Sequence, residues 1–203
     1  MLNRRDFLQQ VPGIAGLILG SLSSLRAGNV ASKAIILRSS WQTENIGDIA
    51  HTPGVLTLLE KYLPDVQVRL WPSNVGNGVE EMLRKRFPNV PIIRTPEEIQ
   101  KAFTDCVFML HGSGPQLVAR KDIERWVNET GKPYGIYGIT FPGVYGFPEE
   151  RSKFNPVDIE LLTNAKFAYF RDSVSLEFAK KNGVKCPIME FCPDGAFAVD
   201  LRD

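Results

Sequence analysis

Four polar or glycine-rich segments of the sequence hold residues that could do chemistry. They are residues 38–48, 111–114, 138–143 and 171–173, and each comes directly after an apolar run that is typical of a buried strand. In an open parallel α/β sheet, ligands bind at the carboxyl ends of the strands. We therefore expect these four segments to meet along one edge of a sheet and to form a cleft there.

The first segment contains Asn45, Gly47 and Asp48 just before a helical pattern. One interpretation is structural: Asp48 caps the helix and Gly47 supplies a tight turn. The other is functional, because the free backbone N–H groups of a helix N-terminus can bind an anion or a sugar hydroxyl. His51 lies one turn further on and would point into the same cleft if the helix began at Asp48.

The second segment is His111, Gly112, Ser113 and Gly114. Its glycines allow the backbone to approach a ligand closely, and the helix that follows favours negative charge. The segment has neither the spacing of a dinucleotide site nor the lysine of a P-loop nor the pattern of a nucleophile elbow. A serine hydrolase using Ser113 with His51 or His111 is one alternative, and a structural role for His111 at the end of a strand is another.

The fourth segment begins with Arg171 and Asp172. Asp172 or Ser173 can act as the N-cap of the next helix. Arg171 has no such role, because a cation at a helix N-terminus opposes the helix dipole. We expect its guanidinium to point into the cleft, where it could hold a carboxylate or phosphate through two hydrogen bonds.

Short apolar runs alternate with helical patterns over residues 33–203, which predicts a single α/β domain. The fold expected is a Rossmann-like, mostly parallel sheet with helices on both faces. We predict strands at 34–37, 66–70, 92–93, 106–110, 134–140, 166–171 and 187–191, and helices at 48–62, 79–87, from 96 onward, 122–130, 157–163 and 173–182. Pro53 could instead mark the first turn of the first helix.

Residues 1–27 have the pattern of an export signal. Arg4 and Arg5 are followed by Asp-Phe-Leu, and a glycine-interrupted apolar stretch covers residues 11–22. This pattern resembles a twin-arginine signal peptide, which exports folded proteins. Ala27 suits the last residue before cleavage. We expect a periplasmic protein, or one tethered to the membrane by this segment if it stays uncleaved.

The composition argues against several classes of partner and cofactor. A net charge of +1 over 203 residues gives no basic field for nucleic acid. The three cysteines are too few for a disulfide framework and are not clustered as in a metal site, so we predict no metal. Cys106 is expected to be buried. Cys186 and Cys192 lie at the two ends of a predicted strand, too far apart for a disulfide unless the chain bends.

Four motifs together resemble those of the polysaccharide pyruvyltransferase family. In chain order they are Asn45-x-Gly47-Asp48, the loop at 111–114, Arg171-Asp172-x-x-Ser175, and Cys192-Pro193-Asp194-Gly195-Ala196-Phe197. The family's corresponding loop contains only glycines, so His111 and Ser113 are departures from the pattern. The resemblance covers residues 34–203.

This resemblance implies the fold of two-domain GT-B-like glycosyltransferases, of which the chain is expected to represent the N-terminal half. It also implies transfer of a pyruvyl group from phosphoenolpyruvate to a sugar of an envelope glycan or exopolysaccharide, with no metal or further cofactor. Residues 45, 47, 48 and 111–114 would then line an interdomain cleft, and Arg171 would hold an anion.

Two alternatives remain at this stage, an exported glycan-binding module without catalysis and an exported hydrolase. The sequence leaves a homo-oligomer open.

Overall fold

The computed structural model of the protein describes residues 34–141 and 155–201. The predicted signal segment at 1–27 and residues 142–143 of the third polar segment lie outside these ranges. Seven strands form one sheet, and every pairing in it is parallel. The strands are β1 (Ala34–Ser39), β2 (Gln67–Pro72), β3 (Phe108–His111), β4 (Gly114–Pro115), β5 (Tyr134–Thr140), β6 (Ala168–Phe170) and β7 (Met189–Phe191).

The strand order is β2-β1-β3-β5-β6-β7, with β4 paired to β5. The chain first moves outward from β1 to β2, then returns to the other side of β1 and continues in the opposite direction. Such a reversal opens a crevice at the carboxyl ends of the two strands that flank it, here β1 and β3. The predicted Rossmann-like α/β fold is therefore confirmed.

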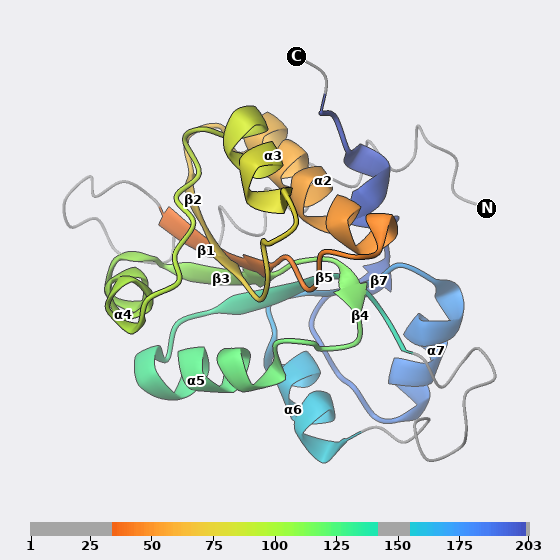
Figure 1. The fold of residues 1–203 in the computed structure, drawn as a ribbon. Helices are drawn as coiled ribbons and strands as arrows, with labels where there is room; N and C mark the ends of the chain where they lie inside the picture. Colours follow the sequence, from red (N-terminus) through yellow and green to blue (C-terminus); the bar gives the residue numbers. More distant parts are fainter. Residues whose placement is uncertain (1–33, 142–154, 202–203) are drawn as a thin grey trace.

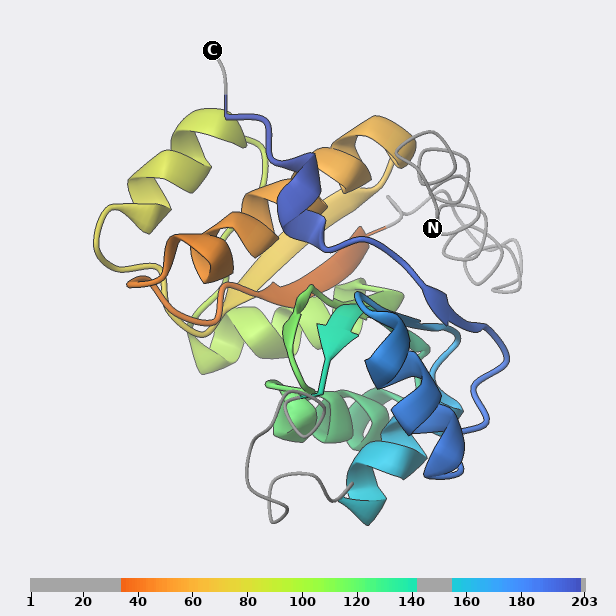
Figure 2. The ribbon, with the colours of Figure 1, turned by 90° about the vertical axis from the view of Figure 1, so that its right-hand side faces the viewer.

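Helices cover both faces of the sheet (Figures 1 and 2). Alternate residues of β1 explain why: Ile35 and Leu37 belong to one buried apolar cluster, while Ala34 and Ile36 belong to another. The first cluster includes side chains of α2 (Ile46–Tyr62) and α3 (Val79–Arg86). The second includes side chains of α4 (Pro96–Asp105), α5 (Arg120–Thr130), α6 (Pro156–Asn164) and α7 (Ser173–Lys181).

Helix α2 differs from its prediction at its start and in its interior. It begins at Ile46, and its N-cap is Asn45, whose side-chain oxygen accepts a hydrogen bond from the Gly47 N–H at 2.8 Å. Asp48 is therefore not the cap. Pro53 lies inside a continuous helix, at a cost of about 3 kcal/mol. Residues 51–56 are all buried, so packing on both sides of the helix offsets this cost.

Two short elements were not predicted. The 3₁₀ helix η3 (Gly195–Ala198) follows β7 and lies beside α2 (Figures 1 and 2). Strand β4 has two residues and continues the line of β3 after a break at Gly112 and Ser113. Conversely, the strand predicted at 92–93 is a single bridge between Ile92 and Leu70.

The three cysteines are free thiols, and Cys106 is buried, as predicted. The predicted strand at 106–110 begins two residues later, because Cys106 serves as the C-cap of α4. Over the described ranges, every helix is too short or too polar to cross a membrane.

Candidate functional site

His51 is the centre of a polar cluster at the carboxyl edge of the sheet. Helix α2 places its side chain inward, and the residue is only 3% exposed. Its Nδ1 lies 2.6 Å from Oδ1 of Asp194, the residue that caps η3. The same carboxylate oxygen accepts a hydrogen bond from the Ala196 N–H at 2.9 Å, which fixes the orientation of Asp194.

Arg171 approaches the other side of the ring from the loop after β6. Its Nη1 donates to Asp194 Oδ2 at 2.5 Å and lies 3.4 Å from Nε2 of His51. An arginine can only donate and a carboxylate can only accept, so the contacts with Asp194 and Arg171 fit one neutral tautomer of His51. In that tautomer Nδ1 carries the hydrogen and Nε2 carries the lone pair.

Asp48 completes the cluster on the Nε2 side. Its Oδ1 lies 3.5 Å from His51 Nε2, and its Oδ2 accepts a hydrogen bond from Gln42 Nε2 at 2.5 Å. The side chains of Asp48 and Arg171 are each about a quarter exposed, whereas His51 is covered. Within the cluster, solvent therefore reaches Asp48 and Arg171 rather than the ring of His51.

Asp194 is held as a carboxylate. Burial alone would raise its pKa, but hydrogen bonds from His51, the Ala196 N–H and Arg171 outweigh burial and lower the pKa to about 2. The site therefore carries a negative charge on the Nδ1 side of His51, and the hydrogen bond to it orients the ring.

Ser113 contacts the same histidine but not in the geometry of a serine hydrolase. Its Oγ lies 3.1 Å from Nδ1, the nitrogen that already bonds to Asp194. In a nucleophilic triad the serine and the carboxylate use opposite ring nitrogens, so that the lone pair faces the serine. Here the lone pair faces away from Ser113, and the arrangement does not favour the hydrolase interpretation.

Close backbone contacts between glycines set the position of Asp194. A Cβ on Gly54 of α2 would lie 1.9 Å from the carbonyl oxygen of Gly195, and a Cβ on Gly195 would lie 2.6 Å from Ser113 Oγ. The helix and η3 can approach this closely only because both residues lack a side chain. Gly138 has a φ of +65° and would place a Cβ 2.8 Å from that of Ser113, so it also requires glycine.

His111, in contrast, is a buried structural residue. Its ring stacks on Trp41, with centroids 4.7 Å apart, and is fully buried. Burial and the nearby Arg38 lower its pKa to about 3, so it is neutral at ordinary pH. Gly112 and Gly114 are packing positions, since a Cβ on the first would lie 2.7 Å from Ser39 Oγ and one on the second 2.3 Å from Trp41 Nε1.

Of the residues predicted from the sequence, the structure brings His51, Asp48, Ser113 and Arg171 together. Asn45 and Gly47 form the cap of α2 at the rim of the cluster. Asp172 caps α7: its carboxylate accepts from the Ser175 N–H at 2.6 Å and from Thr140 Oγ1 at 2.6 Å, which leaves it a structural role.

Asp194 was not selected as a site residue by sequence reasoning. The available signal was its position, since an Asp-Gly pair directly after the last short strand places a carboxylate at the same sheet edge. Over the described ranges, no three His, Cys, Asp or Glu side chains are grouped so as to hold a metal ion.

The fold and this cluster define a Rossmann-like α/β protein with a buried histidine, carboxylates and an arginine grouped at the carboxyl edge of its sheet. The family model for polysaccharide pyruvyl transferase matches residues 45–203. The chain belongs to the polysaccharide pyruvyl transferase family, as its motifs predicted.

Other comparisons add little. No curated protein matches the chain. Among solved structures, the N-acetylmannosamine-6-phosphate 2-epimerase from Clostridium perfringens is 12% identical, with 86% of this chain and 94% of that chain covered and a TM-score of 0.28. This likeness is too weak to bear on fold or function.

Proposed function

We propose that the protein transfers a pyruvyl group from phosphoenolpyruvate to two hydroxyls of one sugar in an envelope glycan or exopolysaccharide. Membership of the family supports this class of reaction. The observation that carries the assignment of roles is the position of His51 Nε2, which lies between a carboxylate and the guanidinium of Arg171. The proposal includes export by the twin-arginine route, which rests on the sequence of residues 1–27.

The reaction balances without an oxidant or reductant. The first sugar hydroxyl loses its proton and bonds to C2 of phosphoenolpyruvate. C3 gains a proton and becomes a methyl group. The bond from C2 to the phosphate oxygen then breaks. The second hydroxyl bonds to C2 to give the ketal, and its proton leaves with phosphate.

His51 suits the removal of a hydroxyl proton. The hydrogen bond from Nδ1 to Asp194 directs the lone pair to Nε2, and the Asp194 carboxylate stabilises the imidazolium that forms. Arg171 suits the donor. Only its Nη1 is hydrogen-bonded within the described residues, so Nε and Nη2 remain for the carboxylate or phosphate of phosphoenolpyruvate.

The test uses purified protein, phosphoenolpyruvate and oligosaccharides released from the envelope polysaccharide of the source organism. We expect phosphate release that depends on the acceptor, together with a new methyl signal in the proton NMR spectrum of the glycan. His51→Gln should lower turnover by about 100-fold or more. Arg171→Lys should raise the KM for phosphoenolpyruvate by about tenfold, because it keeps the charge but loses the fork of donors.

Arg84→Lys is the matched control, since this arginine is 58% exposed on α3 and away from the cluster. Turnover by this control should equal that of the wild type. Glycan binding without any phosphate release would favour the binding-module alternative. Glycan cleavage that disappears in Ser113→Ala would favour the hydrolase.

A further inference from the structure

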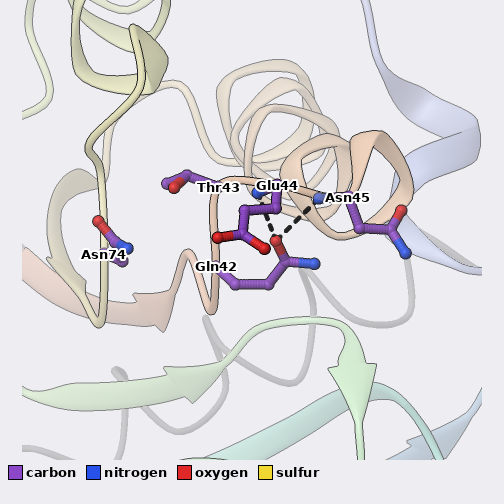
Figure 3. Close-up of a pocket in the computed structure, with 5 residues that line it drawn as sticks. All are labelled: Gln42, Thr43, Glu44, Asn45 and Asn74. Carbon is purple, nitrogen blue, oxygen red and sulfur yellow. Dashed lines mark hydrogen bonds between the residues drawn. The ribbon is translucent and has the colours of Figure 1, made fainter.

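A polar pocket of about 470 Å³ opens beside the His51 cluster. We call it the Gln42 pocket; it is lined by Gln42, Thr43, Glu44, Asn45 and Asn74 (Figure 3). The first four residues belong to the loop from β1 to α2, and Asn74 belongs to the loop after β2. Its volume is within the range of sites for small ligands, and it is large enough for one sugar ring.

The lining is suited to a neutral, hydroxyl-rich ligand. It offers amides, a hydroxyl and a carboxylate, which together supply both donors and acceptors, and it contains no lysine or arginine. Within the described residues, neither the Glu44 carboxylate nor Asn74 Nδ2 has a hydrogen-bond partner. Phosphoenolpyruvate carries several negative charges, so Glu44 and the nearby Asp48 would repel it.

The two loops are held together before any ligand binds. The Ser40 carbonyl accepts hydrogen bonds from the N–H groups of Ser73 and Asn74, both at 3.0 Å, and Ser40 Oγ donates to the Asn74 carbonyl at 2.7 Å. Gln42 Oε1 accepts from the N–H groups of Glu44 at 2.6 Å and Asn45 at 2.9 Å (Figure 3). The pocket is therefore preorganised, which lowers the entropic cost of binding.

Gln42 connects this pocket to the acid–base histidine. Its Oε1 holds the pocket loop, while its Nε2 donates to Asp48 Oδ2 at 2.5 Å. The other oxygen of Asp48 is 3.5 Å from His51 Nε2. A sugar bound against Gln42 would thus be linked to the ring of His51 through two contacting side chains, Gln42 and Asp48.

We propose that the Gln42 pocket binds the acceptor as an uncharged pyranose, while the anionic donor binds on the Arg171 side. This inference deepens the proposed function and rests on it for the identity of the donor. In the bound state Glu44 accepts hydrogen bonds from sugar hydroxyls and Asn74 Nδ2 donates one. The Glu44 carboxylate disfavours the anionic donor in the Gln42 pocket and so leaves this pocket to the uncharged acceptor.

Calorimetry with the same envelope oligosaccharides, in the absence of phosphoenolpyruvate, tests the pocket directly. Glu44→Ala should weaken glycan binding by about tenfold and Asn74→Ala by about three- to fivefold, as expected for lost hydrogen bonds to a charged and a neutral group. Phosphoenolpyruvate binding should stay unchanged in both. Asn89→Ala is the control. Asn89 is an exposed asparagine after α3, and it lines a different groove, which includes the start of β2.

The outcomes separate the pocket from the reaction. Wild-type protein that binds glycan but never releases phosphate, with weaker binding in both variants, would support the pocket and contradict the transferase. Acceptor-dependent transfer with an unchanged acceptor KM in both variants would overturn the pocket and leave the transferase standing. A loss of phosphoenolpyruvate binding in Glu44→Ala or Asn74→Ala, or no glycan binding by the wild type, would also overturn the pocket.

Discussion

The chain contains two histidines, and their surroundings give them different chemistry. His51 is buried but has charged partners on both ring nitrogens, Asp194 on one and Arg171 with Asp48 on the other. His111 is buried under Trp41, and its Nδ1 has no hydrogen-bond partner among the described residues. The first is surrounded by polar partners, and the second is kept neutral by burial.

This difference predicts an acid-sensitive stability that depends on His111. Its pKa is about 3 in the folded protein against an ordinary value of 6.5, so between these values the unfolded chain binds a proton that the folded chain does not. The free energy of unfolding therefore falls as pH falls through this window. Between about pH 7 and about pH 5, the free energy of unfolding measured in urea should fall by about 2 kcal/mol more in the wild type than in His111→Gln.

All other residues are the same in both proteins, so the comparison isolates the contribution of His111. An equal loss of stability in the wild type and in His111→Gln would contradict the neutral, buried state assigned to His111.

At the scale of elements, the sheet and its covering helices could be predicted because their signals are local. Apolar runs mark the strands, and Thr95, Asn155 and Asp172 mark helix starts as side-chain caps. The exact start of α2 was missed because Asn45 and Asp48 are both good caps and only three residues apart. Elements of two to four residues, β4 and η3, are too short for any periodicity to be seen.

Part of the site could also be predicted, because some of its signals are local. Strand ends pointed to His51, Ser113 and Arg171, but the partnership of Asp194 with His51 depends on a contact between residues 143 positions apart. That contact depends on two glycines meeting, Gly54 in α2 and Gly195 in η3. Nothing in the local pattern around either glycine identifies the other.

Gly54→Ala tests this contact. The new Cβ would lie 1.9 Å from the Gly195 carbonyl oxygen, so α2 and η3 must separate. We expect a loss of about 1–3 kcal/mol in the free energy of unfolding, measured in urea, and a larger fractional loss of transfer activity than of folded protein. The activity falls because Asp194 moves away from His51.

Gly47→Ala is the matched control in the same helix. Its Cβ would approach only the flexible side chain of Asn45, at 3.2 Å, so stability should change by less than about 1 kcal/mol. Equal effects of the two substitutions would show that the α2–η3 contact has no special role.

At the scale of the whole molecule, the strand order explains why dispersed residues converge. All strands are parallel, so the loops after β1, β3, β6 and β7 lie along one edge. Those loops, with α2, supply Gln42, His51, Ser113, Arg171 and Asp194. The expectation of one cleft at this edge follows from topology alone. Which side chains contact one another in the cleft depends on side-chain geometry, which topology does not determine.

The predicted export signal gives a test at the same scale. Replacing Arg4 and Arg5 together by lysine should leave the protein uncleaved in the cytoplasm, because the twin-arginine route requires the guanidinium pair. Immunoblots of cytoplasmic, membrane and periplasmic fractions measure this. The control replaces the exposed Arg84 and Arg94 by lysine, the same chemical change within the folded domain, and should leave export intact. Periplasmic protein from the first variant would contradict the signal assignment.

The contact of η3 with α2 also bears on how the protein matures during synthesis. The ribosome releases His51 early and Asp194 about 140 residues later, so strands β2, β1, β3 and β5 can pair while the histidine still lacks its carboxylate. His51 gains this partner only when β7 has joined the sheet and Gly195 has docked on Gly54. The His51–Asp194 contact thus reports that β7 and η3 have joined the rest of the sheet.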